Sequence, residues 1–248
     1  WHGPYRIAKV TPGQSILLQR NPHWWGKSPY FDEIEIRAIE NTAALTANLL
    51  AGDIDMIAGE LGLSVDQALA FQERYGDDYQ IIYKPSLVYE HIDLNLDNPI
   101  LKDVRVRQAL LYGIDRSLIT ERLFQGKQPV AQSNVNPLDI RYDPDIPHYA
   151  YDPDKAAGLL DQAGWVMGAD GIRQKDGTAL SLTLQTTAGN KSRELVQQVL
   201  QNQWKQIGID IRIENEPPRV LFGDTISKRR YPAMAMYAWM SAPESVPR

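Results

Sequence analysis

The first third of the chain alternates apolar and polar residues over short segments, which predicts strands. Segments 5–10 and 15–20 flank the tetrapeptide Thr-Pro-Gly-Gln at 11–14. Proline at the second and glycine at the third turn position favour a type II turn, so the two segments should pair as a hairpin. Segment 34–38 alternates again and predicts another strand. The same patterns predict helices at 43–51 and 64–75 and strands at 54–57 and 79–83.

In the second region, helices alternate with strands. After a strand at 89–96, three apolar stripes at helical spacing follow Asp103, Asp115 and Asp152. An aspartate before a helix accepts hydrogen bonds from the free N–H groups of the first turn, so each should mark a helix start. Segment 128–151, rich in Pro, Asp and Asn, is predicted to be a loop, and loops this long are usually functional.

A strand-helix-strand unit is the strongest structural signal. Segments 180–184 and 209–213 alternate, and the apolar stripe between them ends before Gly208. Such a unit predicts two parallel strands joined by a crossover helix. A short helix after Pro217-Pro218 and a last strand at 233–239 should follow. The fold class predicted is α/β, with a mixed sheet flanked by helices.

Composition excludes several classes of protein. The 248 residues include 43% hydrophobic residues, no cysteine and a net charge of -5. Apolar content is too ordinary for disorder, and disulfides, thiol nucleophiles and cysteine metal sites are excluded. No nucleic-acid partner is expected, because such binding needs a concentrated positive field. The short basic run at 228–230 is interpreted as a solvated loop.

Catalytic and cofactor motifs are incomplete. Gly26-Lys27-Ser28 resembles the end of a phosphate loop, but Asn21 stands where that loop needs glycine. Ser64 lacks the second glycine of a nucleophile elbow. The four histidines do not form a helical metal-binding pair, and the carboxylate pairs lie in loops or helix caps. We therefore predict no cofactor, no metal and no catalytic residue; a secreted hydrolase acting on peptides or glycans is the alternative.

Three stretches in order carry a family resemblance. They are GPYRI at 3–7 with LQRNPHWWG at 18–26; Asn95 with DVRVRQAL at 103–110 and IDR at 114–116; and YDPDKA at 151–156 with LL at 159–160 and AG at 163–164. This combination resembles the bacterial extracellular solute-binding proteins of the peptide and nickel type (family 5), the ligand-capturing components of ABC importers.

The resemblance implies two lobes of the periplasmic binding protein type II kind, which close on a ligand, and an ABC permease as membrane partner. Residues 1–88 would be a partial first lobe and residues 89–248 most of the second lobe, truncated at its C-terminus. The expected location is the periplasm or, in a Gram-positive host, the outside of the cell, with the protein anchored to the membrane. Exposed strand edges and apolar surface on residues 1–88 predict self-association through these residues, or disorder there. A solute sensor without a permease is a further alternative.

The resemblance also implies ligand-binding residues. Peptide binders of the family carry a tryptophan that matches Trp239, an aspartate three residues later and, in some, an arginine three residues earlier. In this chain Ala242 stands at the aspartate position and Met236 at the arginine position. We therefore expect a ligand that is not read by peptide termini: a modified peptide, a glycan, an opine-like compound or a metal chelate. The candidate ligand-binding residues are Trp239, Met240, Ser241, Tyr89, His91, Asn95, Asn134 and Asn136.

Overall fold

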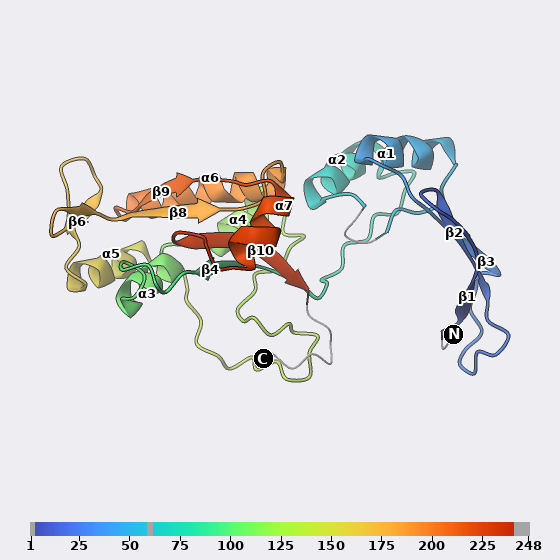
Figure 1. Cartoon of the computed structure of the whole chain (residues 1–248), viewed down its shortest axis with the longest axis horizontal. Helices are drawn as coiled ribbons and strands as arrows, with labels where there is room; N and C mark the ends of the chain where they lie inside the picture. The colour runs from blue at the N-terminus through green and yellow to red at the C-terminus, as the bar shows by residue number, and fades with distance from the viewer. Residues whose placement is uncertain (1–2, 59–61, 241–248) are drawn as a thin grey trace. The chain divides into compact units, whose positions relative to one another are not determined.

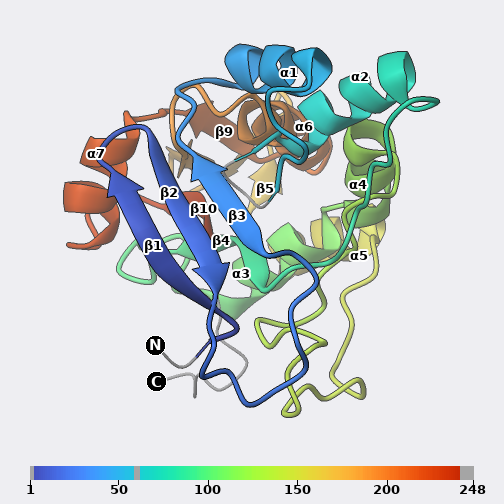
Figure 2. The ribbon, with the colours of Figure 1, turned by 90° about the vertical axis from the view of Figure 1, so that its right-hand side faces the viewer.

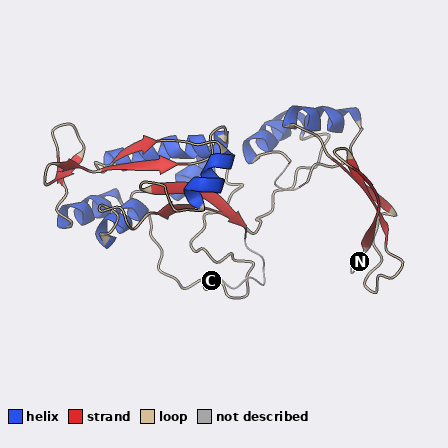
Figure 3. Ribbon diagram, in the orientation of Figure 1, coloured by secondary structure: helices blue, strands red, loops and turns tan. Residues whose placement is uncertain are grey.

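The computed structural model describes residues 3–58 and 62–240. The chain divides into two compact units, residues 1–64 and 65–248. Each unit has a sheet of its own (Figure 3). Residues 65–88 belong to the second unit, whereas the sequence-based prediction places them with residues 1–64 in the first lobe. The correspondence between these units and lobes at 1–88 and 89–248 stays a prediction.

Unit 1 contains a three-stranded antiparallel sheet and one helix (Figure 2). The predicted turn is confirmed, because the Gln14 N–H donates to the Thr11 carbonyl at 3.0 Å and Gly13 has a φ of 72°. Glycine adopts this left-handed conformation without the steric cost of a Cβ atom. The elements, in sheet order and then chain order, are β1 (Tyr5–Thr11), β2 (Ser15–Arg20), β3 (Glu33–Arg37) and α1 (Thr42–Ala51).

Unit 1 leaves its apolar side chains accessible. Within residues 3–58 the structure buries Asn21 but no apolar side chain. Trp25 and Tyr30 are 87% and 88% exposed. Exposed apolar surface of this extent is typical of contact surfaces. The expected self-association through residues 1–88 stays a prediction.

Unit 2 is built on a four-stranded mixed sheet (Figure 1). Its strand order is β4-β10-β8-β9; β4 pairs antiparallel with β10, while β10–β8 and β8–β9 are parallel. The predicted strand-helix-strand unit is therefore confirmed as β8, α6 and β9. The bounds are β4 (Val88–Leu94), β8 (Ser181–Gln185), α6 (Lys191–Gln206), β9 (Asp210–Ile213) and β10 (Met234–Met240).

The predicted helix starts in unit 2 are also confirmed. Asp103, Asp115 and Asp152 accept hydrogen bonds from backbone N–H groups of Arg105, Leu118 and Lys155, each at 2.9 Å. None of the helices in the described part of the chain is long and apolar enough to cross a membrane. The helices are α2 (Val65–Tyr75), α3 (Val104–Tyr112), α4 (Arg116–Phe124) and α5 (Pro153–Gln162).

The main core lies on one face of the unit 2 sheet, beneath α3, α5 and α6. Trp204 of α6 is 1% exposed, and its indole N–H donates to the Leu110 carbonyl of α3 at 3.0 Å. The α3 helix ends beside this contact at Gly113, where a Cβ atom would lie 2.8 Å from Ile207 and 3.1 Å from Trp204. The two helices therefore approach through a position that has no room for a side chain.

Two predicted strands are wrong, and three short strands were not predicted. Segments 54–57 and 79–83 are irregular and pair with no strand in the described chain; a strand without a partner leaves its backbone groups unsatisfied. The predicted helix after Pro217-Pro218 is one α turn followed by a π-helix. The additional elements are β5 (Val166–Met167), β6 (Arg173–Lys175), β7 (Thr178–Ala179), α7 (Pro218–Val220) and η1 (Leu221–Ile226).

The predicted long loop is confirmed, since residues 128–151 contain no helix or strand. The loop has an internal ion pair between Arg141 and Asp139, 2.5 Å apart. The carboxylate is buried, and its hydrogen bonds to the Arg141 side chain and backbone lower the pKa of Asp139 to about 2. This pair stiffens the middle of the loop.

Two glycine substitutions test the packing at Gly113. Gly113→Ala should lower the free energy of unfolding by about 1–3 kcal/mol, because α6 must move away from α3. Gly158→Ala, within α5 and with open space around its new methyl group, should raise it by about 0.5–1 kcal/mol through helix propensity. Urea unfolding followed by circular dichroism measures both. Equal effects of the two substitutions would contradict the packing described.

Acid titration tests the loop ion pair. The folded pKa of Asp139 is about 2, below the ordinary value of about 3.9, so its ionised form stabilises the fold above pH 4. Asp139→Asn should therefore be less stable than wild type at pH 7, with a difference that shrinks between pH 4 and pH 2. Thermal melts across this range measure it, with Asp143→Asn, an exposed carboxylate of the same loop, as control. A difference independent of pH would rule the ion pair out as its cause.

Candidate functional site

The pairing of β4 with β10 brings the main candidate residues together. In this register Trp239 lies opposite Tyr89, and Tyr237 lies opposite His91. Residues directly opposite each other in an antiparallel pair project from the same face of the sheet. The neighbouring pair Met236 and Ile92 belongs to the core on the other face. The candidates therefore occupy the face that the helices of the core leave uncovered.

Ring contacts join these residues into one surface. His91 stacks on Tyr89 with ring centroids 5.0 Å apart and meets Tyr237 edge-on at 4.5 Å. Phe222 of η1 contacts the other side of Tyr237 at 6.1 Å. We call Tyr89, His91, Phe222, Tyr237 and Trp239 the aromatic face. Sequence reasoning missed Tyr237 and Phe222, although the position of Tyr237, two residues before Trp239, places both on one side of a strand.

A carboxylate fixes the centre of this face. The Tyr237 hydroxyl donates to Asp93 Oδ2 at 2.5 Å, and His91 Nε2 lies 3.6 Å from Asp93 Oδ1. Burial and the hydrogen bond to Asp93 raise the pKa of Tyr237 far above its ordinary value. Burial and Asp93 also raise the pKa of Tyr89, while the Arg116 charge lowers it. Both phenols therefore stay protonated at neutral pH and can donate hydrogen bonds.

The end of β10 is exposed and apolar. Trp239 is 62% exposed and Met240 is 64% exposed. Large exposed apolar side chains beside polar rings are typical of ligand-contacting surfaces. Ser241, the third candidate here, lies outside the described residues. Met236 is 5% exposed and belongs to the core, so the side chain at this position does not reach the aromatic face.

Asn95 lies beyond the opposite end of β4 from Tyr89. Its side-chain amide donates to the Tyr231 carbonyl at 2.9 Å, and its Oδ1 accepts from the Asp97 N–H at 3.0 Å. Its backbone N–H donates to the Ala233 carbonyl at 2.8 Å. These bonds hold the turn that follows β4 against the start of β10. The hydrogen bonds of Asn95 therefore serve the fold, and its role in ligand binding stays a prediction.

The two loop candidates differ in their contacts. The Asn136 amide donates to the Ser86 carbonyl at 2.8 Å, and its Oδ1 accepts from the Leu138 N–H at 2.9 Å. This ties the long loop to the segment that enters β4. Asn134 is exposed. Their roles in ligand binding stay predictions.

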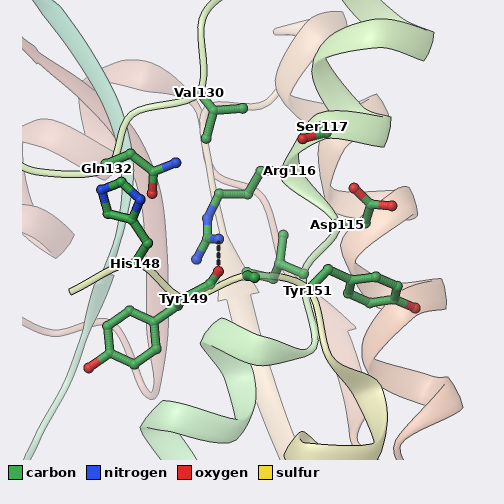
Figure 4. A pocket seen from close by; sticks show the side chains of 10 residues that line it. Asp115, Arg116, Ser117, Val130, Gln132, His148, Tyr149 and Tyr151 are labelled. Atoms are coloured by element: carbon green, nitrogen blue, oxygen red, sulfur yellow. Dashed lines mark hydrogen bonds between the residues drawn. The ribbon is translucent and has the colours of Figure 1, made fainter.

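A pocket of about 270 Å³ lies between the start of α4 and the long loop (Figure 4). Arg116 is its central side chain, and the guanidinium donates to the Tyr149 carbonyl at 2.8 Å and to the Leu111 carbonyl at 3.4 Å. Sequence reasoning used Arg116 for the family resemblance and did not select it for binding. Within the described residues no group of three or more metal-ligating side chains gathers here or elsewhere. The polar lining residues are Asp115, Arg116, Ser117, Gln132, His148, Tyr149 and Tyr151.

A double-mutant cycle tests the Tyr237–Asp93 hydrogen bond. Tyr237→Phe and Asp93→Asn should each destabilise the protein, and the double variant should lose less than the sum of both. A coupling of about 1 kcal/mol is expected, because the bond joins a buried phenol to a half-exposed carboxylate. Urea unfolding of the four proteins gives the coupling. Additive losses would show that the two groups do not interact.

Comparison with known proteins adds the family. The family model described as "Bacterial extracellular solute-binding proteins, family 5 Middle" matches residues 2–247. Over 86% of this chain, the chain is 35% identical to the oligopeptide-binding protein AppA of Bacillus subtilis, of which it covers 38%. It is 26% identical to the nickel-binding periplasmic protein of Escherichia coli, covering 41% of that protein.

Solved structures give the same answer for the fold. NikA from Brucella suis in complex with Fe(III)-EDTA matches with a TM-score of 0.82 and 26% identity, over 97% of this chain and 48% of that one. The oligopeptide-binding protein from Thermus thermophilus, complexed with a pentapeptide, matches with a TM-score of 0.71 and 32% identity, over 98% and 44%. The chain thus spans less than half the length of these relatives. It belongs to the bacterial extracellular solute-binding proteins of family 5.

Proposed function

We propose that this chain is part of the solute-binding component of an ABC importer, which captures a small solute outside the cytoplasmic membrane and delivers it to a membrane permease. The observation that carries the proposal is the aromatic face at the end of β4 and β10, in a chain that belongs to this family. Relatives named for oligopeptides and for nickel support a peptide-like solute or a metal chelate. The protein acts by binding, without catalysis.

Trp239, Tyr89 and His91 form the contact surface in this proposal, and the exposed Met240, the next residue after Trp239, lies at its edge at the end of β10. Their rings and thioether offer apolar area, and the phenol of Tyr89 adds a hydrogen-bond donor. Ser241, Asn134 and Asn136 would add polar contacts at the border of this surface, while Asn95 would shape it from the turn after β4. A rigid sheet that presents rings in fixed positions loses little side-chain entropy on binding. An apolar or chelate-like body with a few polar groups suits such a surface.

The experiment begins with the protein isolated from its own cells, in the length at which they make it. Mass spectrometry of the released small molecules identifies the bound solute, and calorimetric titration gives its affinity. Trp239→Ala should weaken binding about 30-fold, because a central aromatic side chain contributes about 2 kcal/mol or more. Met240→Ala should weaken binding by a smaller factor.

Met167→Ala is the matched control. Met167 is 47% exposed. It lies in β5, in the small sheet that comes directly before β8 in the chain. Trp239 lies in the part of β10 that runs past the last residue of β8. This substitution should leave the affinity unchanged. Turnover of the solute by the purified protein, or wild-type affinity in Trp239→Ala, would contradict the proposal.

A further inference from the structure

The arginines of unit 2 do not share one charge environment. Five of them form ion pairs with carboxylates: Arg105 with Asp103, Arg141 with Asp139, Arg173 with Asp161, Arg193 with Glu90, and Arg230 with Asp224. Arg116 has no ion pair within the described residues, and its guanidinium donates to the carbonyl oxygens of Tyr149 and Leu111. A guanidinium has five N–H donors in a planar fork. Arg116 therefore keeps donor capacity for another acceptor.

The surroundings of Arg116 disfavour an uncompensated charge. Its side chain is partly buried, and this burial lowers the pKa of Arg116, while the nearby phenol of Tyr89 raises it. Removing a cation from water without an opposite charge is costly. A bound anion would offset that cost, and a guanidinium fits a carboxylate through two parallel hydrogen bonds.

The pocket supplies the remaining groups. The side chains of Gln132 and His148 lie together on one side of Arg116 in this view, and Asp115 lies on the other side (Figure 4). The Asp115 carboxylate accepts a hydrogen bond from the Leu118 N–H as the cap of α4. Amide and imidazole groups can donate hydrogen bonds to an anion. The volume of about 270 Å³ suits one end of a solute better than a whole oligopeptide.

We propose that Arg116 is a carboxylate-binding residue: its guanidinium, in the pocket between α4 and the long loop, holds a carboxylate of the solute. This inference rests on the proposed function and specifies the chemical class of its solute as a carboxylate.

The test uses the 248-residue chain labelled with ¹⁵N-arginine and a matched pair of probes. N-acetyl-alanylalanine carries one carboxylate, and its C-terminal amide has the same size without the charge. The Nε–Hε resonance of Arg116, assigned by its loss in Arg116→Gln, should shift saturably with the acid. The amide should bind at least tenfold more weakly. Inorganic phosphate, added in a separate titration, should compete poorly with the acid.

Variants separate recognition from folding. Arg116→Gln should weaken binding of the acid at least tenfold, and Arg116→Lys should recover part of it, because lysine keeps the charge and loses the fork. Arg122→Gln, the same chemical change at an exposed position of α4, should bind like wild type. If Arg116→Gln does not fold, the loss of the resonance in Arg116→Lys assigns it, and the wild-type titration together with the affinity of Arg116→Lys still decides the matter.

Three outcomes overturn the inference: no shift of the Arg116 resonance, equal affinity for acid and amide, or phosphate competing as well as the acid. Tryptophan fluorescence, measured in wild type and in Trp239→Ala during a solute titration, reports binding at the aromatic face independently of Arg116. Solute binding without any contribution from Arg116 would leave the proposed function intact and reject this inference. Acid binding at Arg116 without any solute on the aromatic face would do the reverse.

Discussion

The antiparallel pairing of β4 with β10 is the interaction on which unit 2 depends. Seven residue pairs run from Met234 opposite Leu94 to Met240 opposite Val88. Because side chains alternate between the faces of a sheet, one register sends Met234 and Met236 into the helical core and Tyr237 and Trp239 to the opposite face. A slip of one residue would exchange the two sets, taking the methionines out of the helical core and moving Tyr237 away from Asp93. The stability of the core therefore also fixes the composition of the aromatic face.

Sequence reasoning succeeded where the physical signal is local. The aspartate caps of α3, α4 and α5 act on N–H groups two or three residues away, so the chain itself shows them. It failed at β5, β6 and β7, whose strands of two or three residues are too short to show a period. That small sheet depends on Arg173, a buried side chain that donates to the Ile207 and Trp165 carbonyls and to Asp161. Nothing in a local pattern shows that an arginine will be buried.

The candidate site was predictable in part for the same reason. Tyr89, His91 and Trp239 were found through an alternating pattern and a family resemblance, and the structure brings these three side chains together. Phe222 and Asp93 were not found, because their contacts with Tyr237 join segments far apart in the chain. Arg116 stands in a motif that carries the family resemblance, but only the structure shows that its guanidinium donates to carbonyl oxygens and forms no ion pair within the described residues.

The contacts of the long loop link these two parts of the site. Asn136 ties the loop to Ser86, just before β4, and Arg116 ties its end, at Tyr149, to the start of α4. The loop thus spans from the strand that carries Tyr89 to the helix that carries Arg116. A solute that contacts both residues would add a further link between the same strand and helix. Binding energy would then stabilise the arrangement of loop, strand and helix that forms the site. A solute that reaches only one of the two residues would not provide this stabilisation and would bind more weakly. Selectivity would follow from the length of the solute as well as from its charge.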